Sequence, residues 1–258
     1  MANGFIKTAS IKAAEFPLVY GSTIGRVTGH SRMAVYGHRA LPVAGDDVWE
    51  GGGAYPFLAA ASKLEILSAS ASDAAAGTGA RTFNIMGLDA NFNPISETIT
   101  LAGVTPVVTV NTYLRVNTCN IASAGSGGTN AGDVTLRVQG AGATQAIARA
   151  GYGFAKQCVF TVPTGFTLLV TDVLPECGGN GNATNIILGF TRIGPTGVLQ
   201  TTSEYNAAPG FAAQRTVITG ATIAATNSVT IRVKLVGGAA TDAYAAMNGI
   251  LVDNNYLS

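Results

Sequence analysis

The alternation of hydrophobic and polar positions is strongest in the middle of the chain. Residues 81–88 alternate, with Phe83 and Ile85 on one face, and residues 95–101 alternate again. Between them, residues 89–94 read Asp-Ala-Asn-Phe-Asn-Pro, a composition typical of turns, because Asn and Asp tolerate left-handed backbone and Pro fixes φ. The pattern therefore predicts a β-hairpin with a loop of about five residues.

Shorter runs of β-branched and alternating residues predict further strands on both sides of this hairpin. In residues 229–236 the alternation is clean, and it places Val229, Ile231, Val233 and Leu235 on the inward face. Residues 58–67 fit either a short helix or a strand. The other predicted strands are residues 107–116, 133–138, 157–162, 166–173, 185–193 and 215–219. Short strands separated by Gly, Pro and Asn turns indicate a sandwich or barrel rather than a βαβ fold.

The positions of Gly and Pro residues along the chain predict its domain organisation. Residues 1–45 show neither helical nor alternating periodicity, and Gly and Pro interrupt them every few positions, so an extended arm is expected. We place a first β-sandwich domain at residues 46–140, a linker at 141–150 and a second β-sandwich domain at 151–258. The expected fold is all-β, with an extended N-terminal arm followed by two jelly-roll-like β-sandwich domains.

The composition suggests a protein that is covered by neighbouring subunits. The chain has 258 residues, of which 47% are hydrophobic and only 11% are charged. The usual charged fraction is about 25%, and a free monomer normally needs charge over its surface to remain soluble. We therefore expect a homo-oligomer. A free protein with a neutral Thr- and Asn-rich surface is the alternative.

The few charges are unevenly distributed. The formal net charge of +1 provides no global attraction to nucleic acid or a membrane. Residues 1–45 carry five bases against Glu15 alone, and a basic arm suits docking on an acidic partner surface. Chance scatter of charge explains the same pattern equally well. The five bases, which we take as candidate interface residues, are Lys7, Lys12, Arg26, Arg32 and Arg39.

The densest group of aromatic residues follows the predicted arm. It consists of Trp49, Tyr55 and Phe57, in a chain with 7% aromatic residues. Because Tyr and Trp are enriched at interface hot spots, these three residues are also candidates for an intermolecular interface. The competing interpretation is a hydrophobic plug that closes the core of the first domain.

Candidate catalytic groups are sparse, and we expect no enzyme and no cofactor. His30 and His38 are the only histidines, share no obvious face and are expected to lie in solvent. Asp46, Asp47 and Glu50 form an acidic cluster in which paired carboxylates could act on a glycoside, but a solvated turn is the preferred interpretation.

The cysteines and the N-terminal segment bear on the cellular environment in which the protein is expected. Cys119, Cys158 and Cys177 are odd in number and lack a paired C-x-x-C spacing, so we expect buried free thiols rather than a zinc site or disulfides. The first 21 residues lack the continuous apolar core of a signal peptide. No stretch reaches the ~18 apolar residues of a membrane span. A soluble protein without a standard N-terminal export signal is expected.

Four short segments resemble a recurrent module of virion structural proteins of tailed bacteriophages. They are Val48-Trp-Glu-Gly-Gly-Gly-Ala-Tyr55, Asp73-Ala-Ala-Ala-Gly-Thr-Gly-Ala-Arg81, Gly87-Leu-Asp89 and Ser96-Glu-Thr-Ile-Thr-Leu-Ala-Gly103. Phe160-Thr-Val-Pro-Thr-Gly-Phe-Thr167 is also similar to the second domain of such proteins. The resemblance implies an accessory component of the particle and brings no catalytic residues with it.

Three functional hypotheses follow. The first is a capsid decoration (cement) protein, assembled in the host cytoplasm, that forms homotrimers on the capsid exterior and bridges major capsid protein subunits, without nucleic acid or membrane as a partner. Repetition of weak contacts over a shell would give it large avidity. The second is a head-fibre, tail-fibre or adaptor component. The third is a carbohydrate-binding β-sandwich, which requires exposed aromatic residues on a groove or paired carboxylates.

Overall fold

The computed structural model of the chain describes Gly21 and residues 27–179, 185–194, 197–207, 222–237 and 240–257. Its elements are fifteen β-strands and one short 3-10 helix, η1 (Asn254–Tyr256). The prediction of an all-β protein is confirmed for this part of the chain. The strand predicted at residues 215–219 lies outside it.

Two sheets form a first body from the middle of the chain. One sheet has the order β5 (Val107–Tyr113), β2 (Ser62–Ser68), β7 (Val134–Val138) and β8 (Thr144–Ala148). The other has the order β4 (Pro94–Thr100), β3 (Ala80–Leu88) and β6 (Arg115–Ala124). A single hydrophobic cluster joins Ile66 and Leu136 of the first sheet to Phe83 and Ile85 of the second. The core of this body therefore lies between its two sheets.

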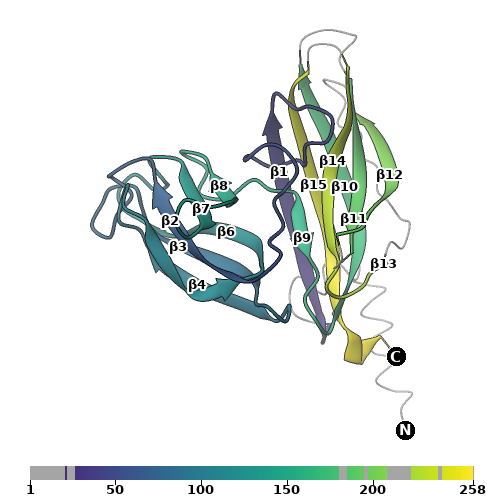
Figure 1. The fold of residues 1–258 in the computed structure, drawn as a ribbon, viewed down its shortest axis with the longest axis horizontal. Coiled ribbons are helices and arrows are strands. Elements are labelled where there is room, and N and C mark those ends of the chain that lie inside the picture. Colours follow the sequence, from purple (N-terminus) through teal and green to yellow (C-terminus); the bar gives the residue numbers. More distant parts are fainter. Residues whose placement is uncertain are drawn as a thin grey trace.

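Two further sheets form a second body. One has the order β1 (His30–Ala40), β15 (Ala240–Asp253), β10 (Phe166–Gly179) and β13 (Thr222–Ile223). The other has the order β12 (Leu199–Ala207), β11 (Asn185–Ile193), β14 (Ser228–Gly237) and β9 (Val159–Thr161). Their shared cluster joins Met33 and Met247 to Phe190 and Ile231. Figure 1 shows the first body, with β2 to β8, lying beside β1 and β9 of the second.

The predicted central hairpin is confirmed. Strands β3 and β4 pair antiparallel, and Leu88 is opposite Pro94 at the closed end. In the loop between them, Asp89 Oδ1 accepts hydrogen bonds from the backbone N–H groups of Asn91 and Asn93, at 2.8 and 2.9 Å. The Asp side chain thus stabilises the turn that its position in the sequence indicated.

Strand β14 follows the predicted alternation over most of its length. Val229, Ile231 and Val233 are fully buried, as predicted, but Leu235 is 50% exposed, so its predicted inward orientation is wrong. The pairing of β11 with β14 shifts register between residues 187 and 188, which lie opposite Leu235 and Val233. A bulge inserts an extra residue on one strand and re-aims the side chains beyond it.

The structure resolves one ambiguity and divides one predicted strand. Residues 62–68, which overlap the segment 58–67 that fitted either a helix or a strand, form β2. The run at residues 107–116 contains two strands, β5 and β6, separated at Leu114. The backbone N–H of Leu114 donates to the carbonyl of Leu88. Each half can therefore pair in a different sheet.

The predicted arm and linker differ from the structure. Residues 30–40 of the predicted arm form β1, which pairs with β15 along its entire length and buries Met33 and Val35. Residues 144–148 of the predicted linker form β8, which pairs with β7 and buries Ala146 and Ala148. Burial of these apolar side chains stabilises both segments as strands despite their Gly-rich flanks. The second body is therefore built from both ends of the described chain.

Candidate functional site

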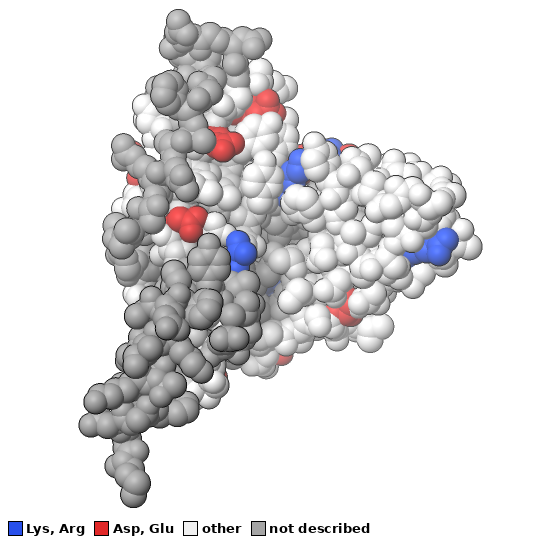
Figure 2. Space-filling view, turned by 180° about the vertical axis from the view of Figure 1, so that it is seen from behind, with Lys and Arg blue, Asp and Glu red and all other residues white. Residues whose placement is uncertain are grey.

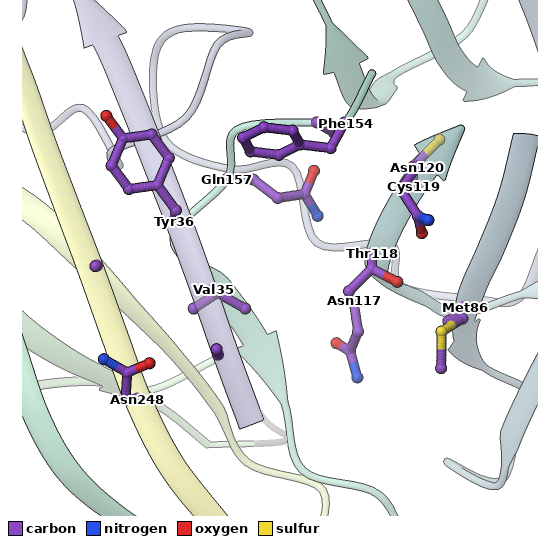
Figure 3. A pocket seen from close by; sticks show the side chains of 13 residues that line it. Val35, Tyr36, Met86, Asn117, Thr118, Cys119, Asn120, Phe154, Gln157 and Asn248 are labelled. Atoms are coloured by element: carbon purple, nitrogen blue, oxygen red, sulfur yellow. The ribbon is translucent and has the colours of Figure 1, made fainter. Parts of the chain in front are cut away.

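A cleft of about 430 Å³ lies between the two bodies (Figure 3). The second body contributes positions on β1 and β15, and the first body contributes β6 and Met86 of β3. The segment at residues 154–157, which connects the bodies, completes the walls. None of the thirteen lining residues carries a charge.

The apolar part of the cleft contains two aromatic rings and a thioether that remain accessible. Tyr36 is 38% exposed, Phe154 39% and Met86 48%. Tyr36 points outward because β1 buries its neighbours in alternation, and the residue opposite it on β15 is the small Ala246. Burial, together with the neighbouring Tyr244, raises the pKa of Tyr36 to about 12, so its hydroxyl remains protonated at neutral pH.

The polar part of the cleft consists of neutral groups on β6, on the connecting segment and at Asn248 of β15. The amide of Asn117 accepts from the N–H of Thr161 and donates to its carbonyl, both at 2.9 Å. Gln157 Nε2 donates to the carbonyl of Val116 at 3.1 Å. Within the described residues, Gln157 Oε1 and Thr118 Oγ1 are buried and have no hydrogen-bond partner. Buried polar atoms without a partner are uncommon and usually indicate a missing water or ligand.

A network of ionisable side chains lies beside the aromatic edge of the cleft. His38 Nδ1 lies 2.7 Å from Glu50 Oε1, His38 Nε2 lies 2.9 Å from Asp242 Oδ1, and the ring stacks on Tyr244 at 4.7 Å. Glu50 Oε2 also accepts from Arg149 Nε of the first body at 2.8 Å. Because carboxylates only accept, His38 satisfies both contacts when both ring nitrogens are protonated. The expectation that His38 lies free in solvent is therefore wrong.

The three acidic residues near Trp49 are buried, not solvated. Asp46 accepts from Arg39 Nε at 2.6 Å, and Asp47 accepts from Nε and Nη2 of Arg232 at 2.7 and 2.8 Å. The fully buried Asp47 and the nearly buried Glu50 tolerate low solvent exposure because charged partners offset their loss of hydration. The predicted solvated turn is a set of ion pairs within the protein.

The aromatic residues predicted at an interface lie inside the chain. Trp49 and Tyr55 are 3% and 4% exposed and pack with Val159 of the second body, and Phe57 packs against this group while partly buried. The Tyr55 hydroxyl donates to the carbonyl of Gln145 in the first body at 2.9 Å. The group therefore fills the junction between the bodies, so Trp49 and Tyr55 are not available for an intermolecular contact. The alternative interpretation of a hydrophobic plug is closer to the structure.

The predicted basic interface is only partly described. Arg32 is exposed, with Nη2 donating to Asn248 Oδ1 at 3.4 Å, whereas Arg39 is engaged by Asp46. The structure does not bring these two arginines together with the aromatic group into one exposed surface. Lys7, Lys12 and Arg26 lie outside the described residues.

The cysteines agree with the prediction of buried free thiols. Cys119, Cys158 and Cys177 are all unpaired and buried. Burial raises the pKa of Cys119 to about 12, so its thiol stays protonated at neutral pH and has little nucleophilic character. Among the described residues, no group of three or more His, Cys, Asp or Glu side chains is placed to hold a metal ion. No described helix is long and apolar enough to cross a membrane.

Sequence reasoning missed the residues of the cleft. Tyr36 could have been found, because Met33, Val35 and Gly37 alternate with exposed residues over a short stretch of β1. Phe154 lies outside the predicted strands, and Gln157 opens the strand predicted at residues 157–162 but precedes β9. Both acquire their role in the cleft only from the approach of the two bodies. No protein-family model, curated protein or solved structure matches the chain.

Proposed function

We propose that the chain is a non-enzymatic structural subunit of a virus particle, specifically a decoration (cement) protein of a tailed-phage capsid. In this proposal it assembles in the host cytoplasm as a homotrimer, joins the capsid exterior and bridges major capsid protein subunits. Resemblance of residues 48–103 to a phage virion module supports the assignment to such particles.

The observation that carries the proposal is the scarcity of charge on the surface. Only 11% of the residues are charged, and among the described residues seven charged side chains are buried. These are Asp46, Asp47, Glu50, Glu65, Asp73, Arg115 and Lys156. Figure 2 shows one face on which, in the described part of the chain, a few charged side chains are scattered among uncharged residues. Such a surface favours association over free dispersion in water.

We also propose that the two bodies are two β-sandwich domains of the kind used as building blocks in particles. The support is that each body has two antiparallel sheets with one hydrophobic cluster shared between them. Face-to-face packing of two sheets over a common core is the defining feature of a sandwich.

Copy number in purified particles tests the proposed function. A cement protein repeats over the shell. We therefore expect a copy number close to that of the major capsid protein, measured by gel densitometry. A fibre or adaptor would be present in far fewer copies. A ratio that low, or absence from particles, would overturn the cement assignment.

Rebinding to particles stripped of the protein tests the role of the N-terminal segment. Deleting the whole predicted arm, residues 1–45, would also remove β1 and its pairing with β15. Removal of residues 1–20 leaves every described strand in place. If this segment attaches the subunit, we expect the shortened protein to fold, by circular dichroism, and to lose capsid binding. Binding equal to that of the full chain would refute the attachment model.

A further inference from the structure

The cleft between the two bodies has the chemical character of a ligand-binding site. Its volume of about 430 Å³ lies within the roughly 300–1,000 Å³ typical of small-molecule sites, which also combine apolar walls with a few polar groups. The rings of Tyr36 and Phe154 are more than one-third exposed. Both belong to segments anchored by the folds of the two bodies, so the site exists only where the bodies meet.

The lining determines the charge of the ligand. Because no lining residue is charged, the cleft offers no counter-ion to a phosphate, a carboxylate or an ammonium group. Its polar groups are the side-chain amides of Asn117, Asn120, Gln157 and Asn248 and the hydroxyls of Thr118 and Tyr36 (Figure 3). Amides and hydroxyls both donate and accept, so they match a ligand that carries neutral groups of both kinds.

Two polar atoms of the lining lack partners. Thr118 Oγ1 and Gln157 Oε1 are buried and unpaired within the described residues, although the side chain of Gln157 is anchored through its Nε2. An unpaired buried acceptor is costly, and rotation of its side chain toward a ligand hydroxyl in the cleft removes the cost. Both atoms belong to residues that line the same cleft.

We propose that this cleft binds a neutral carbohydrate. A pyranose ring has a face of C–H groups that packs on an aromatic ring and an equatorial belt of hydroxyls that pairs with amides. The rings of Tyr36 and Phe154 and the thioether of Met86 match the first feature. Gln157 and Thr118 match the second. This binding activity goes beyond the assembly role and does not depend on it.

Titration of the full-length protein with a panel of neutral oligosaccharides tests the proposal. The panel contains cellotriose, maltotriose, lactose and the trimer of N-acetylglucosamine, and a sialylated trisaccharide is the charged comparison. Isothermal titration calorimetry should show saturable binding of at least one neutral sugar with one site per chain, and weaker binding of the sialylated sugar. No saturable binding by any member, or stronger binding of the charged sugar, overturns the proposal.

Two substitutions locate the site. Phe154→Ala should lower the affinity by about tenfold or more because it removes the ring that packs on the sugar. Tyr256→Ala, at an aromatic residue that is 52% exposed and absent from the cleft lining, is the matched control and should leave the affinity unchanged.

Thr118→Val tests the site in a protein that still folds, because it replaces an unpaired buried hydroxyl with a methyl group of similar shape. We expect an unchanged or higher melting temperature for the free protein, together with weaker sugar binding. Unaltered binding by both cleft variants overturns the proposal. If these variants instead weaken self-association in sedimentation experiments without affecting sugar binding, the cleft is a protein-docking site and the carbohydrate assignment is wrong.

Discussion

At the scale of single residues, the protein uses its few charges inside the fold. Asp73 is fully buried. Its carboxylate accepts hydrogen bonds from the backbone N–H groups of Ala80, Ala131 and Gly132 at 2.7–2.9 Å, and from the Ser68 hydroxyl at 2.5 Å. Burial by itself raises the pKa of Asp73, but the hydrogen bonds outweigh burial and lower the pKa below its ordinary 3.8. The carboxylate thus joins its own loop to the end of β2, the start of β3 and the loop between β6 and β7.

We predict that Asp73→Asn destabilises the protein by about 3 kcal/mol at neutral pH, because the amide group turns a donor toward the backbone N–H groups. The lowered pKa means that Asp73 stabilises the fold above pH 3.8 and that this contribution is lost as pH falls through the lower folded-state value. Urea unfolding over this range should therefore show a weaker acid dependence for the variant. The exposed Glu204→Gln is the control, and equal pH slopes for Asp73→Asn and the native chain would contradict the prediction.

At the scale of elements, strand β1 shows how a glycine allows close packing between segments. Gly37 is buried, and an added β-carbon there would overlap the carbonyl oxygen of Val48 and lie 2.5 Å from the backbone nitrogen of Cys158. These backbone atoms belong to the segments that connect the two bodies, and they hydrogen bond to each other at 2.9 Å. The absence of a side chain at Gly37 therefore lets the connection pack directly on β1.

We predict that Gly37→Ala destabilises the protein by about 3 kcal/mol, because backbone atoms cannot move aside as a flexible side chain can. Gly194→Ala is the matched control, since its nearest neighbour would be a side-chain atom of Asn227 at 3.9 Å. The control should change the stability by less than about 0.5 kcal/mol. Guanidinium unfolding followed by fluorescence measures both variants. A similar loss of stability in the two would show that the close approach at Gly37 is not the cause.

At the scale of the whole molecule, a series of contacts between ionisable side chains links the two bodies. Asp242 of β15 pairs with His38, His38 pairs with Glu50, and Glu50 pairs with Arg149, which also reaches Asp133 at 2.7 Å. The series starts in the second body and ends in the first. It lies beside the cleft, because His38 stacks on Tyr244, which stacks on Tyr36 of the cleft lining.

We predict that His38→Ala destabilises the protein by about 3 kcal/mol, because it leaves the buried carboxylate of Glu50 with one partner fewer. His30→Ala is the control, since the ring of His30 makes one exposed contact, to the carbonyl of Thr28. Denaturant unfolding at neutral pH compares the two variants. Equal stabilities of both variants would show that the His38 contacts contribute nothing net.

The sequence by itself determined the elements whose stability is local. The hairpin β3–β4 could be predicted because its alternation and its Asp- and Asn-rich turn agree within twenty residues. The same holds for the all-β class and the buried free thiols. The cement hypothesis also came from the sequence and stays a proposal.

Only the tertiary structure decided which segments are neighbours. Strand β15 is Ala-rich and gives no strong strand signal, yet it pairs with both β1 and β10. The burial of Trp49, the pairing of His38 and the cleft at Phe154 likewise depend on contacts between distant parts of the chain. Local patterns indicate the secondary-structure propensity of a segment and which of its side chains share a face. Burial and ion pairing depend on which surfaces of the folded chain meet. That information is absent from any short window of the sequence.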